Sequence, residues 1–196
     1  DYGFDDLQND IVVGRAFDNR SGAFVVLEAA RQLSTTKNNV KVHTVATSQE
    51  EIGLRGAKTS SYDANPDVAI AVDVTFATDH PQMSDVIKRE NMIKLGGGPV
   101  LTRGPNMNPK LYDLILKTAK ENKIPIQINA EPRGTGTDAN AIQLCRSGVP
   151  TCLVSIPLRY MHSPCELVHL KDIENFIKLI SETVKKINSK TNFTPF

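Results

Sequence analysis

The chain has 196 residues, of which 40% are hydrophobic and 23% are charged, a composition typical of one globular domain with a buried core. Its formal net charge is +1 and it has no basic block, so we expect no nucleic-acid partner. No apolar run approaches the roughly 20 residues that span a bilayer, and the acidic start DYGFDDLQND is unlike a signal peptide, so we expect no membrane partner.

The first predicted unit is a strand followed by a helix. Residues 11–16 (IVVGRA) read as a short strand, and apolar side chains recur at helical spacing from residue 26 to residue 33. Asp18 therefore falls in the loop between a strand and a helix.

The next stretch, VHTVATSQEEIGLRGA from Val42 to Ala57, begins with an alternating run and stops at two adjacent carboxylates, Glu50 and Glu51. The alternation predicts a strand over residues 42–47. The two carboxylates would then lie at its carboxyl end, where open α/β sheets place their ligands. Adjacent glutamates are also common on solvated helix starts, so the pair alone does not identify a site.

A nearly continuous apolar run, VAIAVDV at residues 68–74, predicts a strand covered on both faces. It carries one acid, Asp73, close to its end. An unpaired buried carboxylate costs several kcal/mol, so Asp73 is expected to form a structural salt bridge, bind a metal ion or face a wet cleft.

The second half continues the alternation of strands and helices. Residues 75–91 read as an irregular excursion, and LGGGPVL, which lacks the GxGxxG spacing of a dinucleotide site, reads as a loop. Asn108 and Pro109 open a helix that ends at Asn122, residues 126–130 form a strand, and a further helix starts at Thr137 or Asp138.

Residues 151–157 (TCLVSIP) form the last predicted strand, and His162 lies in the polar cluster beyond its end. Residues 171–188 form an amphipathic helix, and residues 189–196 are expected to be frayed. The alternation throughout predicts an α/β fold, a three-layer αβα sandwich around a mixed, largely parallel sheet.

One sheet would gather Asp18, Glu51, Asp73 and His162 along one edge, because each follows or ends a predicted strand. Three carboxylates and an imidazole suit zinc, manganese or cobalt, and a shared acid suits a dinuclear site. Two divalent ions would offset the mutual repulsion of the three acids.

Glu50 is the predicted general base, because side chains of adjacent residues diverge and Glu50 can face a metal-activated water when Glu51 is a ligand. His43, His80 and His169 are weaker candidates, since one lies within a predicted strand and two in loops.

The three cysteines form no CxxC pair, and their odd number argues against a disulfide framework and favours a cytoplasmic location. Cys152 lies in an apolar run, where a buried thiol is expected. Cys165 follows His162 closely, but a Cys–His nucleophile would leave the carboxylates without a role.

Five motifs, AFDNRSG, TSQEEIGLRGA, VDV, GTDANAI and RYMHSPCELV, occur in this order over nearly the whole chain. Together they resemble the glutamyl and deblocking aminopeptidases, dinuclear metallo-exopeptidases of which some have been called endoglucanases. The resemblance implies a zinc-exopeptidase-like fold and two ions, with zinc and cobalt favoured. Asp18 would bridge the ions, Glu51 and His162 would bind one, and Asp73 would bind the other.

The same resemblance implies a metal-bridging hydroxide that attacks the peptide carbonyl, with Glu50 as the base. Asp138, Arg159 and Tyr160 would lie near the peptide substrate.

The family's catalytic domain is interrupted by a small β-rich domain that drives assembly into large homo-oligomers. The segment before that domain supplies a further histidine ligand, and neither part is recognisable here. We therefore expect residues 1–10 to be the exit of the inserted domain, residues 11–188 to be a catalytic domain without its N-terminal segment, and residues 189–196 to be a tail.

The leading hypothesis is a metal-dependent aminopeptidase that removes N-terminal residues from peptides. The alternative is a catalytically impaired fragment or a non-catalytic remnant of such an enzyme, and metal stoichiometry separates the two. Glycoside hydrolysis is disfavoured, because adjacent carboxylates cannot readily flank a glycosidic bond.

Overall fold

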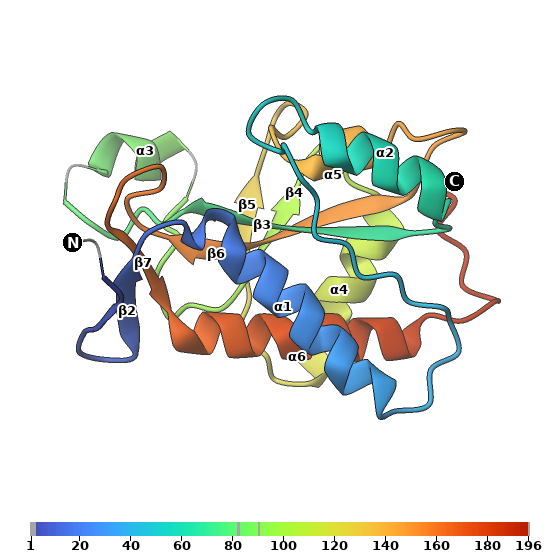
Figure 1. Cartoon of the computed structure of the whole chain (residues 1–196), viewed down its shortest axis with the longest axis horizontal. Helices are drawn as coiled ribbons and strands as arrows, with labels where there is room; N and C mark the ends of the chain where they lie inside the picture. Colours follow the sequence, from blue (N-terminus) through green and yellow to red (C-terminus); the bar gives the residue numbers. More distant parts are fainter. Residues whose placement is uncertain (1–2, 82, 90, 196) are drawn as a thin grey trace.

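The computed structural model describes residues 3–81, 83–89 and 91–195. Its strands form two sheets (Figure 1). Sheet A is antiparallel with the order β1-β2-β7, and sheet B has the order β3-β6-β4-β5. The strands are β1 (Asp5–Asp6), β2 (Ile11–Gly14), β3 (Ala69–Phe76), β4 (Val100–Arg103), β5 (Gln127–Ala130), β6 (Thr151–Leu158) and β7 (Glu166–His169).

Sheet B is mixed and mainly parallel, as the alternation of elements predicts. β3 runs parallel to β6 and β4 runs parallel to β5, while β4 is antiparallel to β6. All eight residues of β6 are buried, which is expected of a strand covered on both faces.

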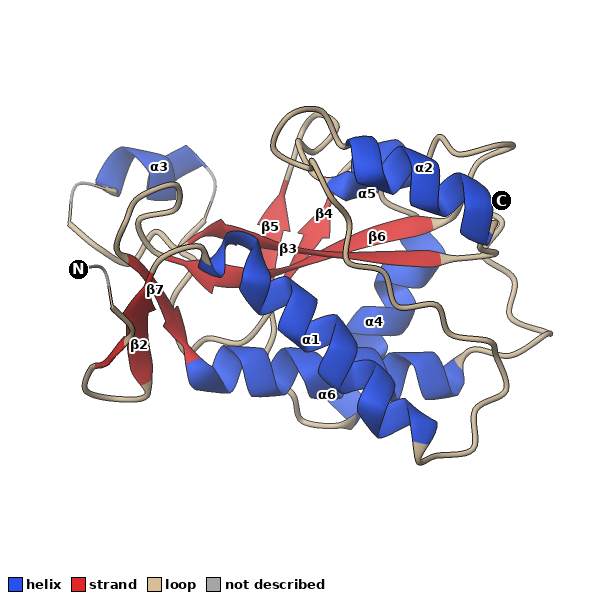
Figure 2. Ribbon diagram, viewed as in Figure 1, coloured by secondary structure: helices blue, strands red, loops and turns tan. Residues whose placement is uncertain are grey.

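Helices cover both faces of sheet B, so the predicted three-layer arrangement is confirmed. Helices α1, α4 and α6 lie on one side of the sheet, and α2 and α5 lie on the other (Figure 2). The helices are α1 (Phe17–Ser34), α2 (Arg55–Ala64), α3 (Ser84–Arg89), α4 (Pro109–Glu121), α5 (Asp138–Ile142) and α6 (Leu170–Lys186).

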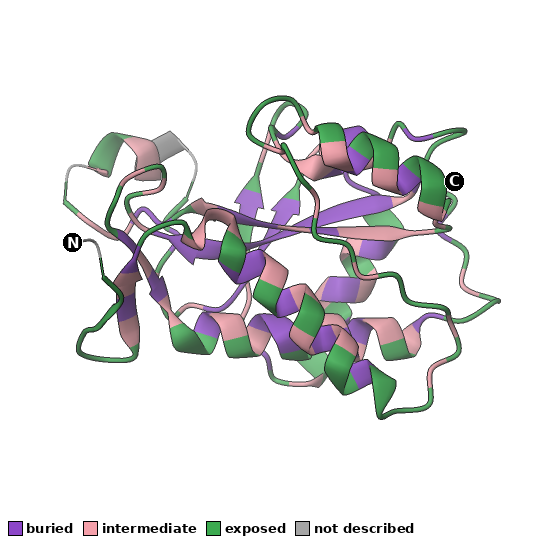
Figure 3. Cartoon of the chain, in the orientation of Figure 1, coloured by how far each residue is buried: buried purple, intermediate pink, exposed green. Residues whose placement is uncertain are grey.

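The core lies between the sheet and the helices α1, α4 and α6. Buried residues line the inner faces of these elements (Figure 3), and Phe176, Leu111 and Val25 have exposed fractions of 0%. α4 begins as predicted, because the Asn108 side chain accepts a hydrogen bond from the Leu111 N–H at 2.9 Å. None of the described helices is both long and apolar enough to cross a bilayer.

The prediction that residues 42–47 form a strand is wrong. They run as an extended segment without assigned strand structure, because no described strand pairs with them. β3 is the outermost strand of sheet B on this side. A groove of about 1430 Å³ is lined both by this segment and by β3, so the two are not neighbours in a ladder.

The expectation of a single sheet is also wrong, since β2, which precedes Asp18, belongs to sheet A. The short elements β4, β7 and α3 lie in regions read from the sequence as irregular or as loops. The tail is not frayed at Phe193, which is 8% exposed and whose carbonyl accepts a hydrogen bond from the Asn108 side chain at 2.8 Å.

Candidate functional site

Three of the four predicted metal ligands converge where the two sheets meet. Asp18, Glu51 and His162 each present a ligand atom within 4.8 Å of the other two. His162 Nε2 lies 2.9 Å from Asp18 Oδ2 and 3.5 Å from Glu51 Oε2. The Asp18 side chain is 10% exposed and that of His162 is 61% exposed. The cluster is therefore buried on the side of Asp18 and open to solvent on the side of His162.

Asp18 lies in the first turn of α1, which is irregular. Asp18 and Asn19 have non-helical backbone angles within α1, and the peptide between them is cis. The Asn19 side chain accepts a hydrogen bond from the Gly22 N–H at 2.8 Å and donates to the carbonyl of Val72 in β3 at 3.0 Å. Asn19 therefore fixes the start of the helix against sheet B.

A compact turn over residues 48–56 presents Glu50 and Glu51. The carbonyl of Glu50 accepts hydrogen bonds from the N–H groups of Gly53 and Leu54, and the Gly56 N–H donates to the Ser48 carbonyl at 2.9 Å. A Cβ atom on Gly56 would lie 2.4 Å from the Ser48 oxygen, so the turn closes only around a glycine.

Glu50 is half-buried beside the cluster. Desolvation is the main cause that raises the pKa of Glu50 to about 7, and the charges of Asp138, Glu51 and Asp18 add to it. A carboxyl group with this pKa can hold or release a proton near neutral pH.

Asp73, the fourth predicted ligand, lies near the cluster but outside the group of three. It is 9% exposed, and its Oδ1 accepts hydrogen bonds from Asn19 Nδ2 at 3.1 Å and from the Val74 N–H at 2.9 Å. Burial is the main cause that raises the pKa of Asp73 to about 7. None of the ion pairs among the described residues includes Asp73, so a structural salt bridge does not account for it.

Asp138 borders the same groove as Asp18, Glu50, Glu51 and Asp73. Its Oδ2 accepts a hydrogen bond from the Thr47 hydroxyl at 2.6 Å, while its Oδ1 is buried without a partner among the described atoms. Burial raises the pKa of Asp138.

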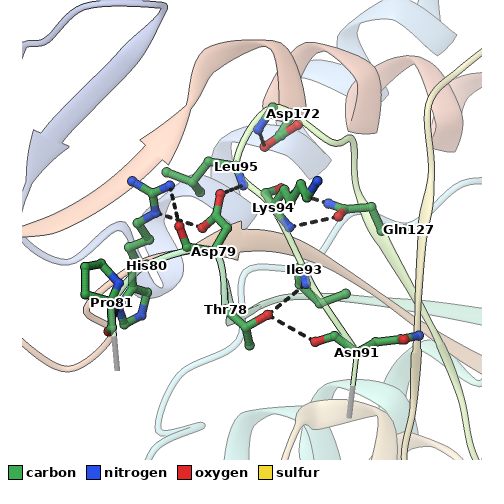
Figure 4. A network of polar contacts seen from close by, with 12 residues as sticks. Thr78, Asp79, His80, Pro81, Asn91, Ile93, Lys94, Leu95, Gln127 and Asp172 are labelled. Atoms are coloured by element: carbon green, nitrogen blue, oxygen red, sulfur yellow. Dashed lines mark hydrogen bonds and ion pairs between the residues drawn. The ribbon is translucent and has the colours of Figure 1, made fainter. Parts of the chain in front are cut away.

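Arg159 and Tyr160 follow β6, as the sequence predicts, but Arg159 has a structural partner. Its Nε donates to Asp79 Oδ1 at 2.8 Å, and Asp79 Oδ2 accepts the Leu95 N–H at 3.0 Å (Figure 4). The Arg159 guanidinium helps hold the pKa of Asp79 below its usual value. Tyr160 is 46% exposed, and its ring centroid lies 5.1 Å from that of His80.

Glu166, the first residue of β7, is a site residue that was not singled out from the sequence. It is 2% exposed, and its two carboxylate oxygens accept the N–H groups of Asp18 at 3.1 Å and His162 at 3.0 Å. The only sequence signal is its place within the RYMHSPCELV motif.

The remaining candidates are less well placed. His43 is exposed on the extended segment, and His169 Nδ1 accepts the Lys171 N–H at 3.2 Å at the start of α6. Cys165 is exposed, and none of the described hydrogen bonds joins it to His162.

The donor set of Asp18, Glu51 and His162 fits a divalent metal ion. Two carboxylates and an imidazole are ligands that zinc and cobalt accept, and the exposed side of the cluster leaves room for a water molecule or a substrate atom.

A family model described as M42 glutamyl aminopeptidase matches residues 1–179. Lysyl aminopeptidase of Pyrococcus furiosus is 43% identical over 178 residues, which cover 91% of this chain and 49% of that protein. The TET aminopeptidase of a marine sediment archaeon of the Thaumarchaeota has a TM-score of 0.88 and 37% identity, covering 96% of this chain and 53% of that one. The Pyrococcus horikoshii TET1 peptidase, which can assemble into a tetrahedron or a large octahedral shell, has a TM-score of 0.78 and 30% identity over 95% of this chain and 53% of that one.

The chain spans about half the length of the curated relatives it matches. The family model, in contrast, covers nearly all of this chain, and the fold matches that of the Thaumarchaeota TET aminopeptidase over 96% of this chain. The chain belongs to the M42 glutamyl aminopeptidase family.

Proposed function

We propose that this chain carries the catalytic centre of a metal-dependent aminopeptidase that hydrolyses N-terminal residues from peptides. The observation that carries the proposal is the convergence of Asp18, Glu51 and His162 beside Glu50, a carboxylate with a pKa raised to about 7. Membership of an aminopeptidase family supports the same reaction.

Asp18, Glu51 and His162 would hold one divalent ion, and Asp73 together with Asp18 would contribute to a second. Zinc or cobalt suits these ligands. When bound, such ions polarise the scissile carbonyl and lower the pKa of water. In the chain without metal, the pKa of Asp18 is raised by burial and by the charge of Glu51, so a cation would relieve unfavourable interactions that are already present.

Glu50 acts as the general base. Its carboxylate takes the proton of the attacking water and delivers it to the leaving amine, a transfer that requires a pKa close to the working pH. Asp138 keeps the pKa of Glu50 high through its charge and is oriented by Thr47.

The substrate is a peptide with a free N-terminus. Relatives are named for different residues, lysyl for one and glutamyl for the family model, so the preferred N-terminal residue does not transfer by similarity. Asp138, which lines the groove, and Tyr160, which is 46% exposed just after β6, are proposed as substrate contacts, whereas Arg159 acts through its ion pair with Asp79. Three free cysteines support a cytoplasmic setting, and the assemblies of TET1 support homo-oligomers for the whole protein.

A catalytically impaired or non-catalytic form of such an enzyme is the second candidate, because Asp73 lies outside the cluster of three ligands. In that case the fold and the cluster of three ligands would be retained, while the second ion and the activity would be weak.

Changing Glu50 to Gln tests the proposal. We expect hydrolysis of amino-acid chromogenic amides, with zinc or cobalt present, to fall by roughly 10²–10⁴-fold while metal content stays the same. Glu174→Gln, an exposed change on α6, is the matched control and should keep full activity. Full activity of Glu50→Gln at unchanged metal content would remove the proton-transfer role.

A further inference from the structure

Glu166 joins two segments that are far apart in the sequence. Asp18 is 148 positions away, in the first turn of α1, and His162 lies in the loop after β6. Each donates its backbone N–H to a different oxygen of the same carboxylate, at 3.1 Å and 3.0 Å. The side chains of these two residues are in contact, with His162 Nε2 2.9 Å from Asp18 Oδ2. Glu166 therefore binds the backbones of both residues whose side chains the proposed metal site needs.

The backbone of Glu166 is itself firmly placed. Glu166 pairs with Gly14 in the antiparallel ladder between β7 and β2, and the next residue, Leu167, exchanges two hydrogen bonds with Arg159 at 3.0 and 3.1 Å. β7 is therefore held both by the strand that leads to Asp18 and by the segment that leads to His162. The side chain of Glu166, the first residue of β7, can therefore set the distance between these two segments.

The segments that Glu166 holds have strained backbones. Ala16, which precedes α1, and His162 both adopt left-handed conformations, with φ of 57° and 61°. Such conformations are unfavourable for residues other than glycine and persist only when surrounding contacts fix them. The hydrogen bond from the His162 N–H to Glu166 is one such contact.

Glu166 is not placed to be a metal ligand. It is 2% exposed, both of its carboxylate oxygens already accept backbone N–H groups, and it is not part of the cluster of three ligands. None of the ion pairs among the described residues includes it. Burying a carboxylate without a cation costs free energy. Two backbone donors alone do not explain why a charged side chain occupies this position.

We infer that Glu166 is a positioning residue, which holds the backbones of Asp18 and His162 so that their side chains meet as a metal-ligand pair. This inference rests on the proposed function, because it takes both residues as ligands. It requires a carboxylate rather than an amide: the Gln side chain offers one acceptor oxygen, and its NH₂ group would face the second N–H.

The chain provides a matched control in Asp172. This residue is 0% exposed, and its two oxygens accept the N–H groups of Gly96 and Gly98, both at 2.7 Å. It is one of the residues of the polar network that also includes Asp79 and Lys94 (Figure 4). Asp172→Asn thus removes one acceptor from a buried carboxylate, as Glu166→Gln does, without touching Asp18 or His162.

Titration of the chain with Co²⁺, followed by visible absorption, tests the inference. We expect Glu166→Gln to weaken Co²⁺ binding by about 10–100-fold and to change the absorption bands, which report ligand geometry. Asp172→Asn should keep the Co²⁺ affinity and the spectrum of the parent, even if it lowers the melting temperature as much as Glu166→Gln does. Parent-like affinity and spectrum in Glu166→Gln would overturn the inference.

Amide hydrogen exchange of the metal-free chain separates this inference from the proposed function. We expect the amides of Asp18 and His162 to exchange faster in Glu166→Gln, and those of Gly96 and Gly98 in Asp172→Asn. If the parent binds no Co²⁺, the metal proposal fails. The positioning role is still tested by the exchange rates of the Asp18 and His162 amides in Glu166→Gln. Unchanged rates would refute that role, and faster rates would support it. If Glu166→Gln does not fold, Glu166→Asp takes its place: its carboxylate is one methylene shorter, so the same outcomes apply.

Discussion

At the scale of single residues, the site gathers several carboxylates whose charges raise one another's pKa values. Asp73 is 9% exposed, and its pKa is raised to about 7 by burial and by the charges of Glu50, Asp18 and Asp138. The ordinary value for this side chain is 3.8. Without metal, ionised Asp73 therefore works against folding.

The sign of this effect predicts a pH dependence of stability. Between pH 3.8 and about 7 the folded chain keeps a proton on Asp73 that the unfolded chain has released, so its stabilising contribution is full below pH 3.8 and is lost as pH rises through about 7. In chelator, we expect the melting temperature to fall less between pH 5 and pH 8 in Asp73→Asn than in the parent. Asp63→Asn, an exposed change on α2, should behave as the parent does. Equal slopes for all three chains would show that Asp73 does not titrate in this range.

Candidate ligands could be chosen from the sequence, but their hydrogen-bond partners could not. Asp18, Glu51 and His162 could be chosen because each is a ligand type at the end of a predicted element, and the structure brings them together. Glu166 could not be chosen in this way, because its role depends on two backbone N–H groups. Backbone donors carry no signal in the amino-acid sequence.

At the scale of elements, the turn over residues 48–56 decides where Glu50 and Glu51 point. The turn is closed by hydrogen bonds from Gly53, Leu54 and Gly56 to carbonyls of residues 48–50. Gly56 is essential to it, because a Cβ atom there would lie 2.4 Å from the Ser48 oxygen and 2.5 Å from the Ser48 nitrogen.

Changing Gly56 to Ala should therefore open the turn. We expect a loss of about 1–3 kcal/mol in the free energy of unfolding, as overpacking usually costs, together with weaker metal binding through Glu51. Gly136→Ala is the control, because a Cβ atom on Gly136 would meet nothing within 4 Å. If urea unfolding gives the same stability for both variants, the turn is not closed in this way.

Elements with strong local signals were predicted correctly. α4 has its Asn108 cap and its proline at the first turn, and α6 has a clear apolar stripe. Residues 42–47 show the alternation of a strand, but a strand also needs a neighbour, and the groove beside β3 leaves the segment unpaired in this chain. β7 was not predicted, because its four residues are too few to show a clear alternation of apolar and polar side chains.

At the scale of the whole molecule, two of the proposed ligands follow strands of different sheets and the third lies in the turn between α1 and α2. Asp18 follows β2 of sheet A, His162 follows β6 of sheet B, and Glu51 lies in the turn before α2. These parts are brought together only in the folded chain, so a bound ion should stabilise folding.

We therefore expect zinc or cobalt to raise the melting temperature of the chain. One ion at 100 times its dissociation constant adds about 2.7 kcal/mol to the free energy of unfolding. Asp18→Ala should lose this gain, whereas Asp63→Ala should keep it. Identical melting of parent and Asp18→Ala, with and without chelator, would refute the assignment of Asp18 as a ligand.

The fold class followed from the alternation of elements, but the division into two sheets did not. It depends on the pairing of β2 with β7, two strands separated by about 150 residues of chain, and local patterns carry no information about such pairing.

A count of bound metal tests the central claim most directly. After equilibrium dialysis against zinc or cobalt, elemental analysis should find one tightly bound ion per chain, lost in Asp18→Ala, Glu51→Ala and His162→Ala. A second ion should bind more weakly, because Asp73 lies outside the cluster of three ligands. Metal content that is the same in the parent and in all three variants, or no bound metal in the parent, would contradict the proposed centre.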